Sequence, residues 1–270
     1  MNESDKGMIA VMRAHWPEYL IEGWALGMFM VSAGVVTALF EHPGAALNLA
    51  IPDPTLRRAL IGIAMGLTAI ALIYSPWGQR SGAHMNPAVT LTYWRMGKVS
   101  AWDAAFYVLS QFLGGTLGVL LVKALMHDAF TSAPVSHIVT VPGSAGVPAA
   151  FLAEFAISAL LMTVVLRVSN SRLAKFTGLC AGVLVALYIT MEAPLSGMSM
   201  NPARSFASAW PAGRWTGFWI YVTAPILGMQ CAASVYLLRS RSGAAACAKL
   251  CHGDRQRCIH CGYLPAGAES

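Results

Sequence analysis

The chain has 270 residues, of which 56% are hydrophobic and only 11% are charged, and its formal net charge is +6 at pH 7. Soluble globular chains carry roughly 25% charged residues, so this composition excludes an ordinary water-soluble domain and indicates an integral membrane protein. We attribute the positive charge to membrane topology and predict no binding to nucleic acid.

Six apolar runs are long enough to cross the hydrocarbon core of a bilayer, which is about 30 Å thick. They cover residues 17–40, 59–77, 103–126, 148–168, 175–192 and 215–238. The first run has no small-residue cleavage site after it, so we interpret it as a retained helix and not as a signal peptide. The sequence therefore predicts an all-α membrane protein with six transmembrane helices and with both termini on one side.

Basic residues next to the spans predict the orientation, because such residues tend to remain in the cytoplasm. The N-terminus, the second and fourth connections and the tail carry most of the 18 Lys and Arg residues, whereas the third connection, 128–147, has none. Arg57 and Arg58 in the first connection oppose this pattern. We expect cytoplasmic termini and, from the compact chain without a targeting segment, the plasma membrane of a prokaryote.

One short phrase occurs twice, as SGAHMNPA at 81–88 and as SGMSMNPA at 196–203. Each copy lies where the apolar pattern breaks, between spans two and three and between spans five and six. Asn caps the free N–H groups of a helix and Pro is tolerated at its first position. Each phrase therefore predicts a short half-helix that begins at Asn86 or Asn201.

The duplication also predicts how the two halves are arranged. If spans one to three and four to six have opposite topology, the two loops re-enter the membrane from opposite faces and their helix N-termini meet near the midplane. Each N-terminus carries roughly half a positive elementary charge. The meeting point is then polar and unfavourable for cations.

These residues resemble the aquaporin, or major intrinsic protein, family. The resemblance rests on SGAHMNPAVT at 81–90, on SGMSMNPARSF at 196–206, on Glu22 and Glu154 early in spans one and four, and on six spans over about 17–239. It implies a right-handed bundle of six transmembrane helices and two re-entrant half-helices, built as an inverted 3+3 repeat. It also implies a passive pore without enzymatic activity in each subunit of a homotetramer.

The resemblance assigns residues to the centre and to the outer constriction of this pore. The paired motifs are Asn86, Pro87 and Ala88 in the first half and Asn201, Pro202 and Ala203 in the second. Arg204 would point into the outer constriction, where fixed donors bind a neutral solute and a permanent charge repels protons and cations. The alternative is that Arg204 snorkels to the membrane interface.

The rest of the selectivity filter departs from the pattern of strict water channels, which pair an aromatic residue with His. The alignment gives Met65 and Ile189 at these positions and Met198 in the loop, with Tyr188 as the candidate if the register differs by one residue. Flexible thioethers give an apolar collar of adaptable width. Ser205 favours a water channel instead. We predict passage of water and of some small neutral solutes, such as ammonia, hydrogen peroxide or a small polyol.

Three ionisable residues in the spans or loops are candidates for a functional role. Glu22 and Glu154 lie inside spans, where such groups are functional candidates by default, and coupling to protons in a transporter is one interpretation. The resemblance implies instead that they brace the re-entrant loops. We assign His84 to the inner vestibule, because no nucleophile or carboxylate partner accompanies it.

The tail is rich in Cys and His and lies outside the resemblance. Cys247, Cys251, Cys258 and Cys261 form a candidate tetrahedral zinc set. The alternative is a disordered tail with reduced thiols. We predict no other cofactor.

The predicted domains are a cytoplasmic N-terminus (1–16), a channel domain (17–239, with repeats at about 17–126 and 148–239) and a cytoplasmic tail (240–270). Three alternative functions remain open at this stage. An inverted-repeat secondary transporter also explains the duplication. A channel regulated by a metal-sensing or redox-sensing tail, or a membrane enzyme or sensor that depends on that tail, explains the cysteines.

Overall fold

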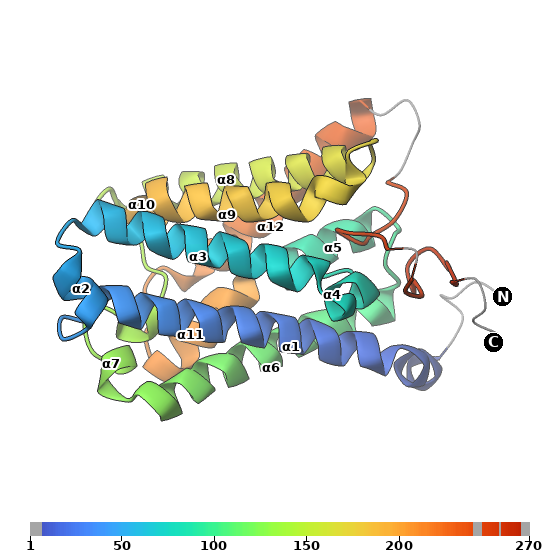
Figure 1. Ribbon diagram of the computed structural model, residues 1–270. Coiled ribbons are helices and arrows are strands. Elements are labelled where there is room, and N and C mark those ends of the chain that lie inside the picture. The colour runs from blue at the N-terminus through green and yellow to red at the C-terminus, as the bar shows by residue number, and fades with distance from the viewer. Residues whose placement is uncertain (1–6, 240–244, 254, 266–270) are drawn as a thin grey trace.

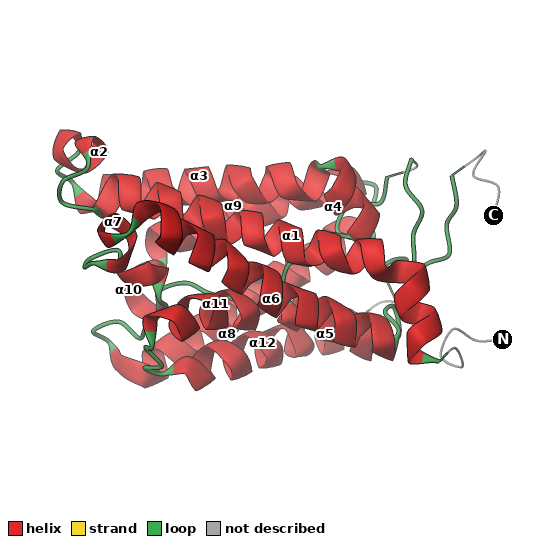
Figure 2. Ribbon diagram, turned by 90° about the horizontal axis from the view of Figure 1, so that it is seen from below, coloured by secondary structure: helices red, strands yellow, loops and turns green. Residues whose placement is uncertain are grey.

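The computed structural model describes residues 7–239, 245–253 and 255–265, and these residues form helices and loops without a strand (Figure 2). The six longest helices are α1 (Met8–Glu41), α3 (Pro54–Tyr74), α6 (Ala101–Met126), α8 (Gly146–Ser169), α9 (Thr177–Met191) and α12 (Phe218–Arg239). The short helices are α2 (Ala46–Ala50), α4 (Pro76–Ser81), α5 (Pro87–Arg95), α7 (Asp128–Thr131), α10 (Ala193–Ser196) and α11 (Pro202–Ala212), with 3-10 turns η2 (Ser136–Ile138) and η3 (Ala174–Phe176). The predicted number of spans is confirmed: among the described residues, six helices are long and apolar enough to cross a membrane, the fifth being η3 and α9 taken together.

The ends of the spans differ from the prediction where local chemistry extends a helix beyond its apolar run. α1 begins at Met8 and continues through Pro17. α3 begins at Pro54, because the carboxylate of Asp53 accepts hydrogen bonds from the backbone N–H groups of Thr55 and Leu56. Hydropathy alone does not detect such a cap. The predictions for residues 1–6, 240–244, 254 and 266–270 lie outside the described residues.

The long helices pack as two similar halves. α1 packs along α6 in the first half and α8 packs along α12 in the second, while α3 and α9 pack against each other across the halves. Small residues allow these close approaches: a Cβ on Gly114 of α6 would collide with the carbonyl oxygen of Gly23 on α1. The same holds for Gly182 of α9 against Gly66 of α3.

The outer surface of the bundle is apolar. α6 exposes a leucine at every fourth position, and the same side of the helix therefore faces outward along its length. These residues are Leu109, Leu113, Leu117, Leu121 and Leu125. A surface of this kind suits hydrocarbon and not water, which explains the apolar composition of the chain.

The half-helices α5 and α11 lie inside the ring of long helices. α5 occupies the half of the bundle where α1 begins and α12 ends, which we call the terminal end, and α11 occupies the opposite half (Figures 1 and 2). A core of small and apolar residues surrounds them; Ala88 and Ala203, each directly after a motif proline, have no exposed surface. This arrangement brings the N-termini of the two half-helices toward each other.

Candidate functional site

The backbone of the two repeated phrases follows the same unusual path. Ala83 and Met85 in the first loop, and Met198 and Met200 in the second, have φ angles between 50° and 55°. Residues other than glycine rarely adopt this left-handed conformation, and it persists only where the surroundings hold it. Each loop then ends in an asparagine whose side chain caps the following half-helix.

The two asparagines also cross-link the loops. Nδ2 of Asn86 donates a hydrogen bond to the carbonyl oxygen of Met200 at 2.7 Å, and Nδ2 of Asn201 donates one to the carbonyl oxygen of Met85 at 2.7 Å. Their Oδ1 atoms accept from the backbone N–H groups of the half-helices. Because an amide has two N–H groups, each asparagine keeps a second N–H for another partner.

A buried glutamate lies behind each loop. Glu22 of α1 accepts from the backbone N–H of His84 and Met85 at 3.0 and 2.7 Å, and from Oγ of Ser81 at 2.7 Å. Nε2 of Gln111 on α6 donates a further bond to it at 2.9 Å. Both oxygens of the Glu22 carboxylate are therefore occupied by donors that hold the first loop in its left-handed conformation.

Glu154 of α8 has the equivalent position in the second half. Its carboxylate accepts from the backbone N–H groups of Ser199 and Met200 at 2.6 and 2.7 Å, and from Oγ of Ser196 at 2.7 Å. The serines were not singled out from the sequence, although each is the first residue of a repeated phrase. The signal was therefore present in the duplication itself.

A tyrosine in the last span of each half completes this support, and the sequence analysis missed it. Tyr107 of α6 donates from its hydroxyl to the carbonyl oxygen of Ser81 at 2.7 Å. Tyr221 of α12 donates in the same way to the carbonyl oxygen of Ser196. Both tyrosines are fully buried.

One cavity of about 500 Å³ passes the meeting point of the half-helices. Its lining extends from Glu41 and Pro54, at the end opposite the termini, past Asn86 and Asn201, to Leu250 near the terminal end. Most of the other lining residues are apolar. The asparagine amides therefore supply hydrogen-bonding groups in the middle of a path that offers few others.

The structure brings the four predicted filter residues to this cavity. Met65, Ile189, Met198 and Arg204 all line it. Nη1 of Arg204 donates a hydrogen bond to the carbonyl oxygen of Ile138 at 2.9 Å. This bond holds the guanidinium at the cavity wall, so the side chain does not snorkel to the membrane interface. Of the two register alternatives, Ile189 is among the lining residues and Tyr188 is not.

His84 also lines the cavity and is 3% exposed. It stacks on the ring of Tyr93, with the centroids 5.3 Å apart. Its Nε2 donates a hydrogen bond to the carbonyl oxygen of Ala248 at 2.8 Å. The tail after α12 therefore reaches the cavity, a contact that the sequence analysis did not anticipate.

The structure brings three of the four tail cysteines named above together. The donor atoms of Cys247, Cys258, Cys261 and His252 all lie within 4.8 Å of one another. Cys251 is outside this group, and His252, the next residue along the chain, takes its place.

Comparisons with known proteins place this geometry in a family. The family model described as Major intrinsic protein matches residues 13–236. Aquaporin NIP1-2 of Oryza sativa subsp. japonica is 38% identical over 177 residues, which are 64% of this chain and 58% of that protein. Aquaporin NIP1-2 of Arabidopsis thaliana is 35% identical over 188 residues, which are 65% of this chain and 61% of that protein.

The matched part of the chain thus spans about three fifths of the length of these relatives. Both relatives come from plants and give no support to the expected prokaryotic membrane. The X-ray structure of the aquaglyceroporin from Plasmodium falciparum is similar in fold, with a TM-score of 0.66 and 22% identity. The similarity covers 82% of this chain and 95% of that one, and it confirms the predicted arrangement of helices.

Proposed function

This chain is a multi-pass membrane protein of the major intrinsic protein family, and on that premise we propose that it is a passive channel for water that also admits small neutral solutes. The observation that carries the proposal is the meeting of Asn86 and Asn201 in a single cavity that Arg204 also lines. A path with fixed donors at its centre and an apolar wall elsewhere suits a neutral molecule that exchanges hydrogen bonds as it passes.

The same arrangement accounts for the exclusion of ions and protons. The N-termini of α5 and α11 direct the positive ends of two helix dipoles at the centre of the path. Arg204 adds a permanent positive charge. When the remaining amide N–H groups of Asn86 and Asn201 both donate to the oxygen of a passing water, both of its lone pairs are used and it cannot accept a hydrogen bond from a neighbouring water.

The collar near Arg204 supports passage of solutes larger than water. Met65, Ile189 and Met198 contribute no ring to this collar, and the two thioethers adopt alternative rotamers at little cost. Neutral solutes of the size of ammonia, hydrogen peroxide or a small polyol fit this description. Strongly hydrated ions do not, because an apolar collar offers no replacement for their water ligands.

Proposals on topology and assembly complete this function. The basic residues beside the spans support a terminal end that faces the cytoplasm. Membership of the family supports a homotetramer with one pore in each subunit. The buried carboxylates of Glu22 and Glu154 are occupied by loop donors, which favours a channel over an ion-coupled transporter.

Stopped-flow light scattering on proteoliposomes tests the proposal. Osmotic shrinkage in an impermeant sugar reports water flux, and re-swelling in glycerol, urea or an ammonium salt reports solute flux, all in buffer that contains a metal chelator. We expect water flux well above that of protein-free liposomes, with a weak temperature dependence. Water flux equal to that of protein-free liposomes would contradict the proposal.

A matched pair of arginine variants locates the filter. Arg204→Ala removes the charge from the cavity, and we expect it to raise solute flux and to admit protons. Arg214→Ala removes an exposed arginine just after the same half-helix and should leave both fluxes unchanged. An equal response of the two variants would show that Arg204 does not form the filter.

A further inference from the structure

The described tail residues cover the cavity at the terminal end of the bundle. The backbone N–H of Leu250 donates to the carbonyl oxygen of Gly82 at 3.1 Å, and Ala248 accepts the hydrogen bond from His84 described above. Gly82 and His84 both belong to the first re-entrant loop. The segment Ala248–Leu250 is thus attached directly to the loop that forms the inner part of the pore.

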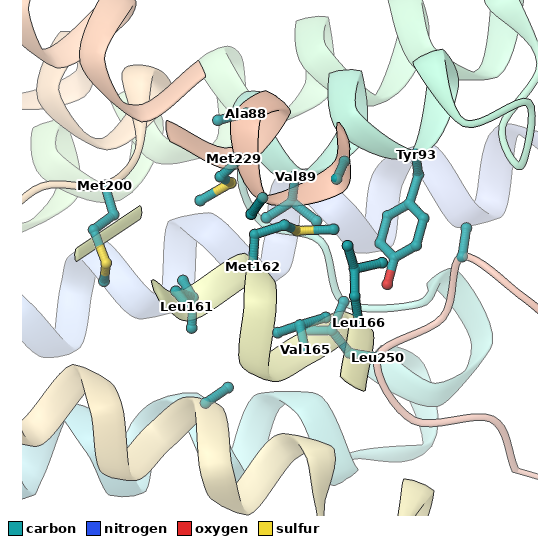
Figure 3. Packing of buried hydrophobic residues seen from close by; sticks show 14 of the residues in the cluster. Ala88, Val89, Tyr93, Leu161, Met162, Val165, Leu166, Met200, Met229 and Leu250 are labelled. Carbon is teal, nitrogen blue, oxygen red and sulfur yellow. The ribbon is translucent and has the colours of Figure 1, made fainter. Parts of the chain in front are cut away.

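Leu250 itself lies inside the mouth of the cavity. Its side chain is 6% exposed, lines the cavity and belongs to the same apolar cluster as Val165 and Leu166 of α8 (Figure 3). An apolar side chain in a narrow mouth excludes water by dewetting. The side chain of Leu250 is therefore placed to exclude water from this end of the path.

The group of Cys247, His252, Cys258 and Cys261 lies directly beside this segment. Sγ of Cys247 is 3.4 Å from Sγ of Cys258, and Nε2 of His252 is 3.3 Å from Sγ of Cys261. Tetrahedral zinc with bonds of about 2.3 Å to sulfur and about 2.0 Å to nitrogen requires ligand atoms about 3.5–3.8 Å apart. Three thiols and one imidazole whose ligand atoms all lie within 4.8 Å of one another form a ligand set of the type found in structural zinc sites.

The local backbone brings two of these cysteines together at a tight turn. Cys258 and Cys261 have the spacing Cys-x2-Cys, followed by a turn at Gly262 with φ of 74° and a hydrogen bond from its N–H to the carbonyl oxygen of Cys258. Metal ligands of this kind bind as thiolates.

Lys249 provides a compensating charge. It is 2% exposed, and its ammonium group donates to the carbonyl oxygen of Arg257 at 2.7 Å. A divalent ion with three thiolates and one neutral imidazole carries a net charge of −1. A buried ammonium group beside such a complex neutralises it, whereas thiolates held this close together without a metal would repel one another.

The positions of the ligands in the sequence connect the group to the mouth. Cys247 and His252 flank the segment that contains Ala248 and Leu250, so one ion that binds both would close a short loop around that segment. Cys258 and Cys261 would join this loop to the part of the tail that Arg257 fastens to Glu18 of α1. Without the ion, hydrogen bonds and apolar packing alone hold Leu250 in place.

We propose that Cys247, His252, Cys258 and Cys261 bind a single zinc ion, and that the bound ion holds Leu250 in the mouth and closes the pore at the terminal end. The gating part of this proposal rests on the channel function proposed above. The metal site stands independently of it, because it depends only on the geometry of the tail.

The metal content of the full-length protein, purified without a metal-chelating tag, tests the site. We expect a single zinc ion per chain in the wild type and its loss in the double variant Cys258→Ser/Cys261→Ser. Cys251→Ser is the matched control, since it removes a cysteine of the same tail that lies outside the group, and it should retain the metal. Zinc-free wild type after incubation with zinc, or loss of zinc in Cys251→Ser alone, would overturn the site.

A second measurement uses only the wild type, so its result does not depend on whether the cysteine variants fold. Replacement of zinc by Co²⁺ should give the visible absorption bands of a tetrahedral site and a thiolate charge-transfer band in the near ultraviolet. An octahedral Co²⁺ spectrum, or a disulfide between Cys247 and Cys258 in protein purified under reducing conditions, would refute the assignment.

Water flux in proteoliposomes tests the gate. A membrane-permeant zinc chelator should raise the water permeability of the wild type several-fold, and added zinc should reverse the rise. Leu250→Ala should bind zinc but conduct in its presence, and the double cysteine variant should conduct with no response to chelator. Zinc-loaded wild type that conducts as fast as chelated protein would refute the gate.

The outcomes separate the two proposals. If chelated wild type, Leu250→Ala and the double variant all fail to conduct while the wild type binds zinc, the channel function and the gate fail and the metal site remains. If all of them conduct and none binds zinc, the metal site and the gate fail and the channel function remains.

Discussion

Arg257, close to the end of the described chain, forms a two-point ion pair with Glu18 near its beginning, with Nε–Oε1 and Nη2–Oε2 distances of 2.8 Å each. Glu18 is completely buried and also accepts from Arg80, which precedes the first re-entrant loop. The pair therefore connects the tail, the first span and the approach to the pore. A buried carboxylate with two guanidinium partners is a strong local constraint, because removal of a partner leaves charge that is poorly compensated.

Arg257→Ala should loosen the tail. The lost charge-assisted hydrogen bonds contribute about 1.5–3 kcal/mol, so opening of the tail should become at least roughly tenfold more frequent. The rate of alkylation of Cys258 in metal-free protein, measured by mass spectrometry, reports this opening. Arg255→Ala removes an exposed arginine two residues earlier; it is the control and should leave the rate unchanged.

Glu154→Gln should destabilise the second re-entrant loop. The amide of Gln presents an NH₂ group to backbone N–H donors that the carboxylate accepted, and each donor left without a partner costs about 1–3 kcal/mol. We expect a lower melting temperature in detergent and reduced water flux. Asp128→Asn alters an exposed carboxylate that does not line the cavity, and it should leave both quantities nearly unchanged. Equal losses in the two variants would contradict the bracing role.

Asn201→Asp should disrupt the cross-link between the loops. A carboxylate cannot donate a hydrogen bond to the carbonyl oxygen of Met85. One of its oxygens would instead face that carbonyl oxygen at the distance that the hydrogen bond now spans, and the two oxygens would repel each other. We expect strongly reduced water flux, together with weaker exclusion of cations because a negative charge enters the path. Planar-bilayer conductance and stopped-flow scattering on the same preparation measure the two effects. Unchanged water flux would show that the cross-link is dispensable.

Met65→Phe combined with Ile189→His should narrow the collar. A ring and a polar imidazole replace flexible or branched apolar groups, so larger neutral solutes should be excluded while water still passes. Re-swelling in glycerol or urea should fall to the rate of protein-free liposomes. Tyr188→Phe is the control, because Tyr188 does not line the cavity, and it should leave the selectivity unchanged.

The six spans and the start of each half-helix could be predicted because their causes are local. Long apolar runs identify the spans, and an Asn-Pro pair caps and begins a helix wherever it occurs. The ends were less accurate, since the cap that Asp53 provides extends α3 beyond its apolar core. The long-range contacts could not be predicted in this way: Asn86 and Met200 are 114 positions apart, and only the packing of the two halves brings them together.

The tail shows the same division between local and tertiary causes. The sequence by itself determined that thiols and imidazoles are dense after α12, because composition is enough to mark a candidate metal-binding segment. Only the tertiary structure decided that His252 and not Cys251 completes the group, and that Leu250 enters the cavity. Adjacent residues in an irregular segment point in different directions, and which of them faces the ligand group depends on how the backbone is held against Gly82 and His84.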